Sequence, residues 1–385
     1  MSLENAFAEF THRDWERTER EQAGEDAQPA ASDRSGTPAT SETSATPATP
    51  ETIRLAIVGV GNFARNRALP AIAESRYCET TMLVTGSPDQ CRTLHERFGI
   101  DHIVTYDAFL AGNHVDTYDA VYVATPNAFH GRYAITAADH GKHVLCEKPL
   151  ETTAERAQEI VDACDDAGVT LMTAYRLQVE PAVRRTKELV ADGVIGDVVQ
   201  AHAGFSHPLL DHADPDTWRL DPDLAGGGAL VDLGIYPLNT IRFILEMDPD
   251  SVYATTHSST APFDAVDEHV SFQLEFPTGA TAACTASFDA HASSWLELIG
   301  TDGLISIASP FGGVVPQEMV VESGDVRMEY TGPSVDEVRE EFEYFGYCVV
   351  TGTDPEPDGE DGVADLAIIE AAYESAETHC RVELS

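Results

Sequence analysis

The sequence predicts an α/β protein built from two parts. An N-terminal Rossmann domain with a doubly wound parallel sheet is expected over residues 52–175, and a C-terminal α+β domain with a largely antiparallel open sheet over residues 176–385. Two observations lead to this division. Apolar strands alternate with helices in the first part, and strands follow one another without intervening helices in the second. The 385 residues suffice for about two domains of the usual ~100–200 residues.

Continuous apolar runs in the first part are typical of strands that are buried on both faces of a parallel sheet. The expected strands are Ile53–Val58, Thr80–Thr85, Ala120–Ala124, His143–Cys146 and Thr170–Tyr175. The expected helices between and around them are Phe63–Ser75, which contains Pro70, Asp89–Phe98, Phe129–His140 and Ala154–Ala167.

The second part begins with an expected helix at Pro181–Asp192 and a strand at Val198–Ser206. The further strands are Val252–Ser258, His269–Phe276, Ala280–Phe288, Trp295–Gly300, Leu304–Ile307, Met319–Glu322 and Val326–Tyr330. Gly300-Thr301-Asp302-Gly303 predicts a hairpin turn, and helices at Asp336–Val350 and Gly362–Thr378 close the chain. Because one face of this sheet has no obvious covering helix, we expect a homodimer or homotetramer packed through it.

Residues 1–51 are expected to form an N-terminal arm and a disordered linker. The linker, residues 23–52, consists of Ser, Thr, Pro, Ala and acidic residues without a large apolar side chain. The arm carries Phe7, Phe10 and Trp15. The arm is either a flexible terminus or a segment that docks on a neighbouring subunit.

The charge of the chain is strongly acidic, with 66 Asp+Glu against 23 Lys+Arg and a formal net charge of −43. The acidic residues are spread along the chain, which indicates a halophilic protein whose carboxylates are screened by concentrated salt. An acidic protein from an ordinary cytoplasm is the alternative. In either case the acidic surface repels nucleic acid and anionic membranes, so neither is expected as a partner.

The seven cysteines are scattered, without a CxxC motif or a Cys/His spacing typical of zinc sites. We therefore expect reduced core thiols and no metal. Since no signal peptide begins the chain and no apolar run reaches about 18 residues, we expect a cytoplasmic protein.

A dinucleotide site is predicted where Gly59-x-Gly61-x-x-Ala64 follows the first strand and opens a helix. The first glycine allows the tight turn, and the second lets the backbone approach a pyrophosphate at the helix N-terminus. The turn continues through Asn62 and Phe63, which are included as cofactor contacts.

The end of the second strand predicts NADP rather than NAD. It carries no Asp or Glu for the ribose hydroxyls, whereas Thr85 and Ser87 could donate hydrogen bonds to a 2′-phosphate. Arg92 is a basic candidate contact for that phosphate, as are Arg65 and Arg67.

Two more motifs are expected at the same sheet edge, where ligands bind in open α/β sheets. Thr125-Pro126-Asn127-x-x-His130 ends a strand and could line the nicotinamide–ribose pocket, although His130 could instead cap the following helix. Glu147-Lys148-Pro149 ends the next strand. Lys148 is one of only three lysines in the chain, and a lysine at a buried strand end is costly to desolvate, so it is a candidate catalytic residue.

A glycine-rich segment, Gly226-Gly227-Gly228, precedes Asp232 and Tyr236. Since these two residues are four apart, they would share one face of a helix. Asp232 could be a surface acid and Tyr236 a packed ring, but the apolar neighbours of Asp232 disfavour a solvated role.

Taken in order, these motifs resemble those of the glucose–fructose oxidoreductase, inositol dehydrogenase and MocA (Gfo/Idh/MocA) oxidoreductases. The resemblance covers about residues 52–385 and also includes Tyr175-Arg176 and the segment from Gly228 to Asn239. Within the family the sequence is most similar to the NADP-dependent D-xylose 1-dehydrogenases of halophilic archaea, which share Arg13-Asp14-Trp15 in the arm. The long Ser/Thr/Pro linker departs from that pattern.

The resemblance implies oxidation of a sugar at C1 to the lactone, with D-xylose as the first substrate to test. It implies Tyr236 as the base, Lys148 as the cation that favours its phenolate, and Asp232 as the residue that holds the lysine or the sugar. Further contacts to substrate or nicotinamide are implied for Glu147, Arg176, Trp218 and Asn239. The alternatives are another sugar, polyol or dihydrodiol dehydrogenase of the family, and a catalytically silent NADP-binding regulatory sensor.

Overall fold

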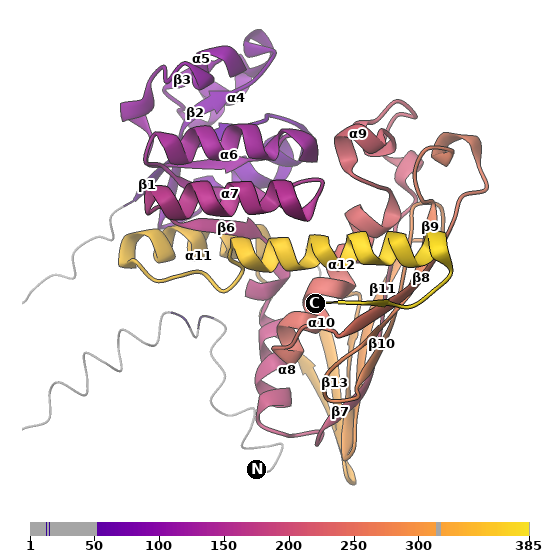
Figure 1. Ribbon diagram of the computed structural model, residues 1–385. Helices are drawn as coiled ribbons and strands as arrows, with labels where there is room; N and C mark the ends of the chain where they lie inside the picture. The colour runs from indigo at the N-terminus through magenta and orange to yellow at the C-terminus, as the bar shows by residue number, and fades with distance from the viewer. Residues whose placement is uncertain (1–12, 14, 16–51, 313–316, 385) are drawn as a thin grey trace, which may run out of the picture.

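The computed structural model describes residues 13, 15, 52–312 and 317–384, and it shows two α/β parts side by side (Figure 1). The predicted fold class is confirmed, because the first part contains a six-stranded sheet and the second a nine-stranded sheet. The predicted disordered linker lies, except for Thr52, outside the described residues. The division at residues 175 and 176 stays a prediction.

The first sheet has the strand order β3-β2-β1-β4-β5-β6, and every neighbouring pair is parallel. Its strands are β1 Ile53–Val58, β2 Cys78–Val84, β3 His102–Val104, β4 Ala120–Val123, β5 His143–Glu147 and β6 Leu171–Ala174. This is the order of a Rossmann fold, so the carboxyl ends of all six strands meet at one edge.

Helices cover both faces of this sheet, which explains why its strands read as unbroken apolar runs. One face packs against α6 His130–Asp139 and α7 Ala154–Ala167. The other packs against α3 Leu69–Ala73 and α11 Glu337–Thr351, which returns to this sheet from the far end of the chain. The shorter helices α4 Arg92–Phe98 and α5 Tyr106–Leu110 complete this part.

The helix expected at Phe63–Ser75 is not uniform. A π-helical stretch, Ala64–Ala68, precedes α3, and Pro70 lies in the first turn of α3. Because proline has no N–H to donate, the regular hydrogen-bond ladder cannot continue through this position, and the preceding turn is widened.

The second sheet has the order β14-β13-β12-β11-β7-β10-β9-β8-β15, in which only the β10–β7 pair is parallel. Its strands are β7 Val198–Ser206, β8 Ser251–His257, β9 His269–Glu275, β10 Thr281–Ser287, β11 Ser293–Gly300, β12 Gly303–Ala308, β13 Glu318–Ser323, β14 Val326–Thr331 and β15 Val382–Glu383. Along β9 buried and exposed residues alternate strictly, so one face of the sheet lies on the core and the other is open.

Four helices belong to this part: α8 Pro181–Ala191, α9 Pro222–Ala225, α10 Ile235–Leu245 and α12 Gly359–Thr378. The longest, α12, packs against both α7 and β8 and so connects the two parts (Figure 1). The segment Pro222–Leu245 is long and apolar enough to cross a membrane by length and composition, but 83% of its most apolar 18-residue stretch is buried inside the protein, as in a core helix.

Two residues of the N-terminal arm are described, and both lie against α11. Trp15 is only 9% exposed, with its ring centroid 4.8 Å from that of Tyr347 and 5.5 Å from that of Tyr344. The Arg13 guanidinium pairs with the Glu340 carboxylate at 2.7 Å. The arm therefore makes an ordered contact on its own chain at these two positions.

All seven cysteines are free. Six are buried, as expected for core thiols, but Cys380 is exposed because it follows the end of α12.

Candidate active site

The carboxyl edge of the first sheet gathers predicted residues from five strands. Gly59 follows β1, Thr85 follows β2, Thr125 follows β4 by two residues, Lys148 follows β5, and Arg176 follows β6 by two residues. The parallel topology alone brings them together, since their separations in sequence are large.

The glycine-rich turn fits a dinucleotide. Gly59 has φ +99°, and a Cβ there would lie 2.5 Å from the Ala124 carbonyl oxygen, so the protein itself requires glycine. At Gly61, by contrast, a Cβ would meet no described atom within 4 Å. The Thr125 hydroxyl is also buried here without a described partner. The space at Gly61 would let a pyrophosphate approach the backbone at the helix N-terminus. The unpaired Thr125 hydroxyl could bind the pyrophosphate or the ribose. The adjoining Asn62 is exposed, and the ring of Phe63 packs on the core.

Arg65 connects the glycine turn to the segment after β2. Its guanidinium donates to the Val60 carbonyl at 2.8 Å and to the Gln90 carbonyl at 3.3 Å, so it bridges the glycine turn and the segment after β2. The Thr85 hydroxyl accepts from the Ser87 amide at 3.2 Å. Arg92 lies farther out, exposed and paired with Asp89 at 2.7 Å, and Arg67 pairs with Asp336.

His130 and Asn127 position the loops of the cleft. His130 is fully buried, and its two ring nitrogens face the carbonyls of Thr125 at 2.9 Å and of Pro149 at 3.1 Å. Burial lowers the pKa of His130, against the opposing effect of these carbonyls. The Asn127 amide donates to the Ala225 carbonyl at 2.9 Å. Both side chains are therefore engaged by protein groups, and a direct contact of either with the cofactor stays a prediction.

Lys148 and Asp232 form the centre of the site. Asp232 lies on the π-helical segment Leu230–Gly234, which leads into α10. The Lys148 ammonium donates to the Asp232 carbonyl at 2.8 Å and to its carboxylate at 3.1 Å. The other carboxylate oxygen accepts from the Arg219 guanidinium at 3.1 Å.

The charges of this pair are mutually stabilised. Burial would lower the pKa of Lys148, but attraction to Tyr236, Asp232 and Glu147 outweighs it and the pKa is raised. Burial would likewise raise the pKa of Asp232, but the Lys148 and Arg219 cations hold it well below its usual range. Lys148 is thus a cation and Asp232 an anion at neutral pH.

The phenol of Tyr236 lies between two cations. The Lys148 ammonium is 4.6 Å from its ring centroid, and the Arg176 guanidinium, 4.7 Å from the same centroid, donates a hydrogen bond to the phenol oxygen. Arg176 is held in turn by the Glu337 carboxylate at 2.6 Å. The Phe205 ring packs edge-on against the Tyr236 ring, with centroids 5.3 Å apart. The phenol oxygen thus accepts a hydrogen bond from one cation, and a second cation lies close to the ring.

A small cavity of about 10 Å³ lies beside this phenol. Lys148, Tyr175, Arg176, Tyr236 and Asn239 are among its lining residues. Asn239 is nearly buried, and its amide donates to Asp361 at 3.0 Å and Asp365 at 2.9 Å, so it forms part of the wall. Chemically, the site offers a polarised phenol, an ammonium and a carboxylate at the mouth of a dinucleotide cleft, which suits proton removal from an alcohol.

Two family models match this chain. The oxidoreductase family with an NAD-binding Rossmann fold matches residues 53–175, and the GFO/IDH/MocA C-terminal domain matches residues 183–306. The D-xylose 1-dehydrogenase [NADP(+)] of Haloarcula marismortui is 42% identical over 335 residues, which are 86% of this chain and 93% of the relative. The chain belongs to the Gfo/Idh/MocA oxidoreductase family.

Other relatives of this Gfo/Idh/MocA oxidoreductase are also dehydrogenases or reductases by name. D-xylose 1-dehydrogenase (NADP(+)) 2 of Haloferax volcanii is 37% identical over 85% of this chain and 98% of the relative. Among solved structures, an aldose-aldose oxidoreductase from Caulobacter crescentus, complexed with glycerol, has a TM-score of 0.82 and 32% identity over 87% of this chain and 100% of its own. A 3-ketoreductase from Actinomadura kijaniata in complex with NADP and TDP-benzene has a TM-score of 0.76 and 26% identity over 84% of this chain and 98% of its own.

Several contacts of this Gfo/Idh/MocA site were not expected from the sequence. Arg219 pairs with Asp232, and its guanidinium lies 4.6 Å from the ring of the preceding Trp218. Its place shortly before the glycine-rich segment is the sequence feature that could have indicated this role. Glu337 has no such signal, since it lies 161 residues from its partner Arg176. The expected cofactor contact Glu147 accepts a hydrogen bond from the buried Tyr122 phenol.

Proposed function

We propose that this protein oxidises an aldose at C1 to the lactone with NADP as cofactor, and that D-xylose, giving D-xylonolactone, is its substrate. The observation that carries the proposal is the phenol of Tyr236 between Lys148 and Arg176 at the carboxyl edge of the Rossmann sheet. Two relatives at 42% and 37% identity that are named as NADP-dependent D-xylose 1-dehydrogenases support the substrate class and the cofactor.

The residues around the cofactor cleft support NADP. The end of β2 carries no carboxylate to repel a 2′-phosphate, and Arg65 lies between the glycine turn and that strand end. The Ser87 amide donates a hydrogen bond to the Thr85 hydroxyl. The hydroxyl groups of both residues are potential donors to a 2′-phosphate at this strand end.

In this proposal, bound NADP supplies the acceptor for the hydride that leaves C1. The phenolate of Tyr236 accepts the proton of the C1 hydroxyl. Lys148 and Arg176 stabilise the negative charge on the phenol oxygen before that transfer. Asp232, itself anchored by Arg219, keeps the Lys148 ammonium beside the ring. The sugar would bind beside the Tyr236 phenol, next to the small cavity that Tyr236 and Asn239 line.

The test is a screen of pentoses and hexoses with NADP and with NAD in molar potassium chloride, following the absorbance of the reduced cofactor. We expect the highest kcat/KM for D-xylose with NADP, and lactone as the product. Turnover of a polyol or a dihydrodiol in preference to aldoses, or a higher kcat/KM with NAD, would contradict the proposal. Absence of turnover with preserved NADP binding would favour the regulatory sensor.

The similarity to the aldose-aldose oxidoreductase favours one second candidate, in which the hydride passes to another aldose and the cofactor stays bound. The two candidates differ in their need for added cofactor. Incubation of the purified protein with two aldoses and no added NADP, followed by analysis of lactone and alditol, separates them. Equal amounts of lactone and alditol would support the second candidate.

We further propose that the protein forms a homodimer or homotetramer through the open face of the second sheet. Trp295 and Tyr253, which the strand register places on the same face, are 41% and 39% exposed. The Trp295 ring lies against Gly204, where a Cβ would lie 2.2 Å from it. Sedimentation in molar salt should give an oligomer for the native protein and a shift toward monomer for Trp295→Glu. A native protein that sediments as a monomer at micromolar concentration would contradict this.

A further inference from the structure

The segment that carries Asp232 and Tyr236 is held at its start by a buried carboxylate from a distant loop. Asp267 is 8% exposed and lies between η10 Ala261–Phe263 and β9. Its two carboxylate oxygens accept from the Gly228 amide at 2.8 Å and the Leu230 amide at 2.7 Å. Its backbone carbonyl accepts from the Ala229 amide at 2.9 Å. Three consecutive amides at the beginning of a helix are thus satisfied by one residue, as a capping residue does.

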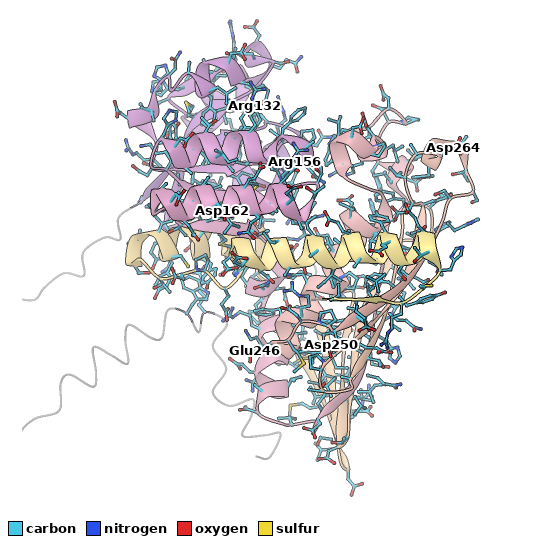
Figure 2. The ribbon with its side chains drawn as sticks, in the orientation of Figure 1. Arg132, Arg156, Asp162, Glu246, Asp250 and Asp264 are labelled. Carbon is cyan, nitrogen blue, oxygen red and sulfur yellow. The ribbon has the colours of Figure 1, made fainter. Side chains whose placement is uncertain are left out.

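This contact explains why Gly228 is a glycine. A Cβ at this position would lie 2.2 Å from the Asp267 carbonyl oxygen and 2.8 Å from its carboxylate. The Tyr373 phenol on α12 donates to the same carboxylate at 2.7 Å, so Asp267 is itself fixed by another helix. Figure 2 labels Asp264, which lies three residues before Asp267 in the connection between β8 and β9.

We propose that Asp267 is a positioning residue for the proposed reaction, whose carboxylate sets the direction of the helix that carries Asp232 and Tyr236. The inference rests on the proposed function of Tyr236. Tyr236 is six positions after Leu230, which is roughly 9 Å along a helix. A small tilt at the held amides therefore moves the phenol away from Lys148 and Arg176. A displacement of about 1 Å at reacting groups can lower the rate by about 10²-fold.

Asp267→Asn is the informative substitution. The amide keeps the shape of the carboxylate but replaces one acceptor by an NH₂ donor, which would face either the Gly228 or the Leu230 amide. An NH₂ that faces Leu230 takes the carboxylate acceptor from this buried N–H, whereas one that faces Gly228 leaves that amide only the Tyr373 phenol oxygen at 3.2 Å. In both cases the first turn loses its best acceptor and must shift.

The neighbouring Glu268 provides a matched control. It is 1% exposed, and its carboxylate accepts from the Ser259 amide at 2.6 Å and the Thr260 amide at 3.1 Å. Glu268→Gln therefore disturbs the same kind of buried carboxylate–backbone contact, one residue away, in a loop that carries none of the proposed catalytic residues. A purely structural role would make the two variants behave alike.

The experiment measures kcat, KM and NADP affinity of full-length Asp267→Asn and Glu268→Gln in molar salt, together with amide hydrogen exchange over residues 228–236. For Asp267→Asn we expect kcat to fall about 10²-fold with KM changed less than about threefold, and faster exchange in this segment. Glu268→Gln should keep kcat within about threefold. Equal losses of kcat in both variants, or an Asp267→Asn protein with native kcat and exchange, would overturn the proposal.

A second variant covers the case in which Asp267→Asn does not fold. Tyr373→Phe keeps the carboxylate but removes the hydrogen bond that orients it and the phenol oxygen that the Gly228 amide also contacts, at 3.2 Å. We expect kcat to fall several-fold with faster exchange over residues 228–236. Unchanged exchange in Tyr373→Phe would contradict the positioning role. If the native protein oxidises no sugar, the proposed function fails, while the exchange measurements still decide whether Asp267 holds the helix.

Discussion

Arg176 donates a hydrogen bond to the phenol oxygen of Tyr236, although the two residues are 60 positions apart in the chain. The contact joins the end of the Rossmann sheet to the helix of the second part that forms the cavity wall. Because Glu337 holds the Arg176 guanidinium from its other side at 2.6 Å, the arginine cannot turn away without leaving a nearly buried carboxylate unpaired. The phenol is therefore held between a guanidinium and the Lys148 ammonium.

Tyr236→Phe should remove the proton acceptor and leave the fold intact. The phenyl ring keeps its packing against Phe205, whereas the oxygen that accepts the hydroxyl proton is lost. We expect kcat to fall by at least about 10²-fold, the lower end of general acid–base contributions. Steady-state kinetics with D-xylose across neutral and alkaline pH measure this, with Tyr253→Phe on the open sheet face as the matched control. An unchanged kcat with an unchanged pH–rate profile would exclude Tyr236 as the base.

Lys148→Met should abolish turnover while NADP still binds. Methionine keeps an apolar stem of similar length but lacks the charge that lies 4.6 Å from the Tyr236 ring. Fluorescence titration with NADP should give an affinity close to that of the native protein, and product analysis should detect little or no lactone. Lys142→Met is the control, because this lysine lies at the opposite end of β5. Retention of activity within about tenfold, about 1.4 kcal/mol of barrier, would remove Lys148 from the mechanism.

The sequence was sufficient to predict most elements because their patterns are long and local. The strand expected at Val198–Ser206 and the helix at Ala154–Ala167 are observed with the same limits. The strand β3 was missed since it has three residues and is only partly buried. The packing of α11 on the first sheet could not be predicted either, because an amphipathic helix does not indicate which of two sheets it covers.

The same reasoning applies to the site. The resemblance to the family implied that Asp232 holds Lys148 or the sugar, and the Asp232 carboxylate does lie 3.1 Å from the Lys148 ammonium. Their partners Glu337 and Asp267 lie in segments of ordinary composition, and their roles depend on contacts across the whole chain. Such residues carry no local signal, so only the folded arrangement identifies them.

Glu180 should make the stability of the protein depend on pH. It is 6% exposed and caps α8 by accepting from the Val183 amide at 2.9 Å, and burial raises its pKa to about 7. Between its ordinary pKa of about 4.3 and 7, the unfolded chain has released this proton while the folded protein keeps it. The contribution of Glu180 therefore falls as pH rises through this window, by a few kcal/mol at most.

Glu180→Gln should remove that dependence, because glutamine resembles the protonated acid and can still accept from the Val183 amide. We expect the variant to be more stable than the native protein at pH 8 and equally stable near pH 4. Guanidinium unfolding at both pH values measures the difference, and Glu155→Gln at an exposed position of α7 is the control. A stability difference that is the same at both pH values would show that folding does not raise the pKa of Glu180.

Trp15→Ala should release the N-terminal arm from α11. The indole is 9% exposed and packs against Tyr344 and Tyr347, so its loss removes this aromatic part of the contact, while the ion pairs of Arg13 with Glu340 and Glu343 stay. We expect a loss of about 1–3 kcal/mol, below the cost of truncating a core tryptophan because the arm can detach without unfolding the sheets. Limited proteolysis should cut the variant faster within residues 1–51, whereas Trp15→Phe should remain protected. Equal proteolysis of Trp15→Ala and the native protein would show that the arm is not held by this residue.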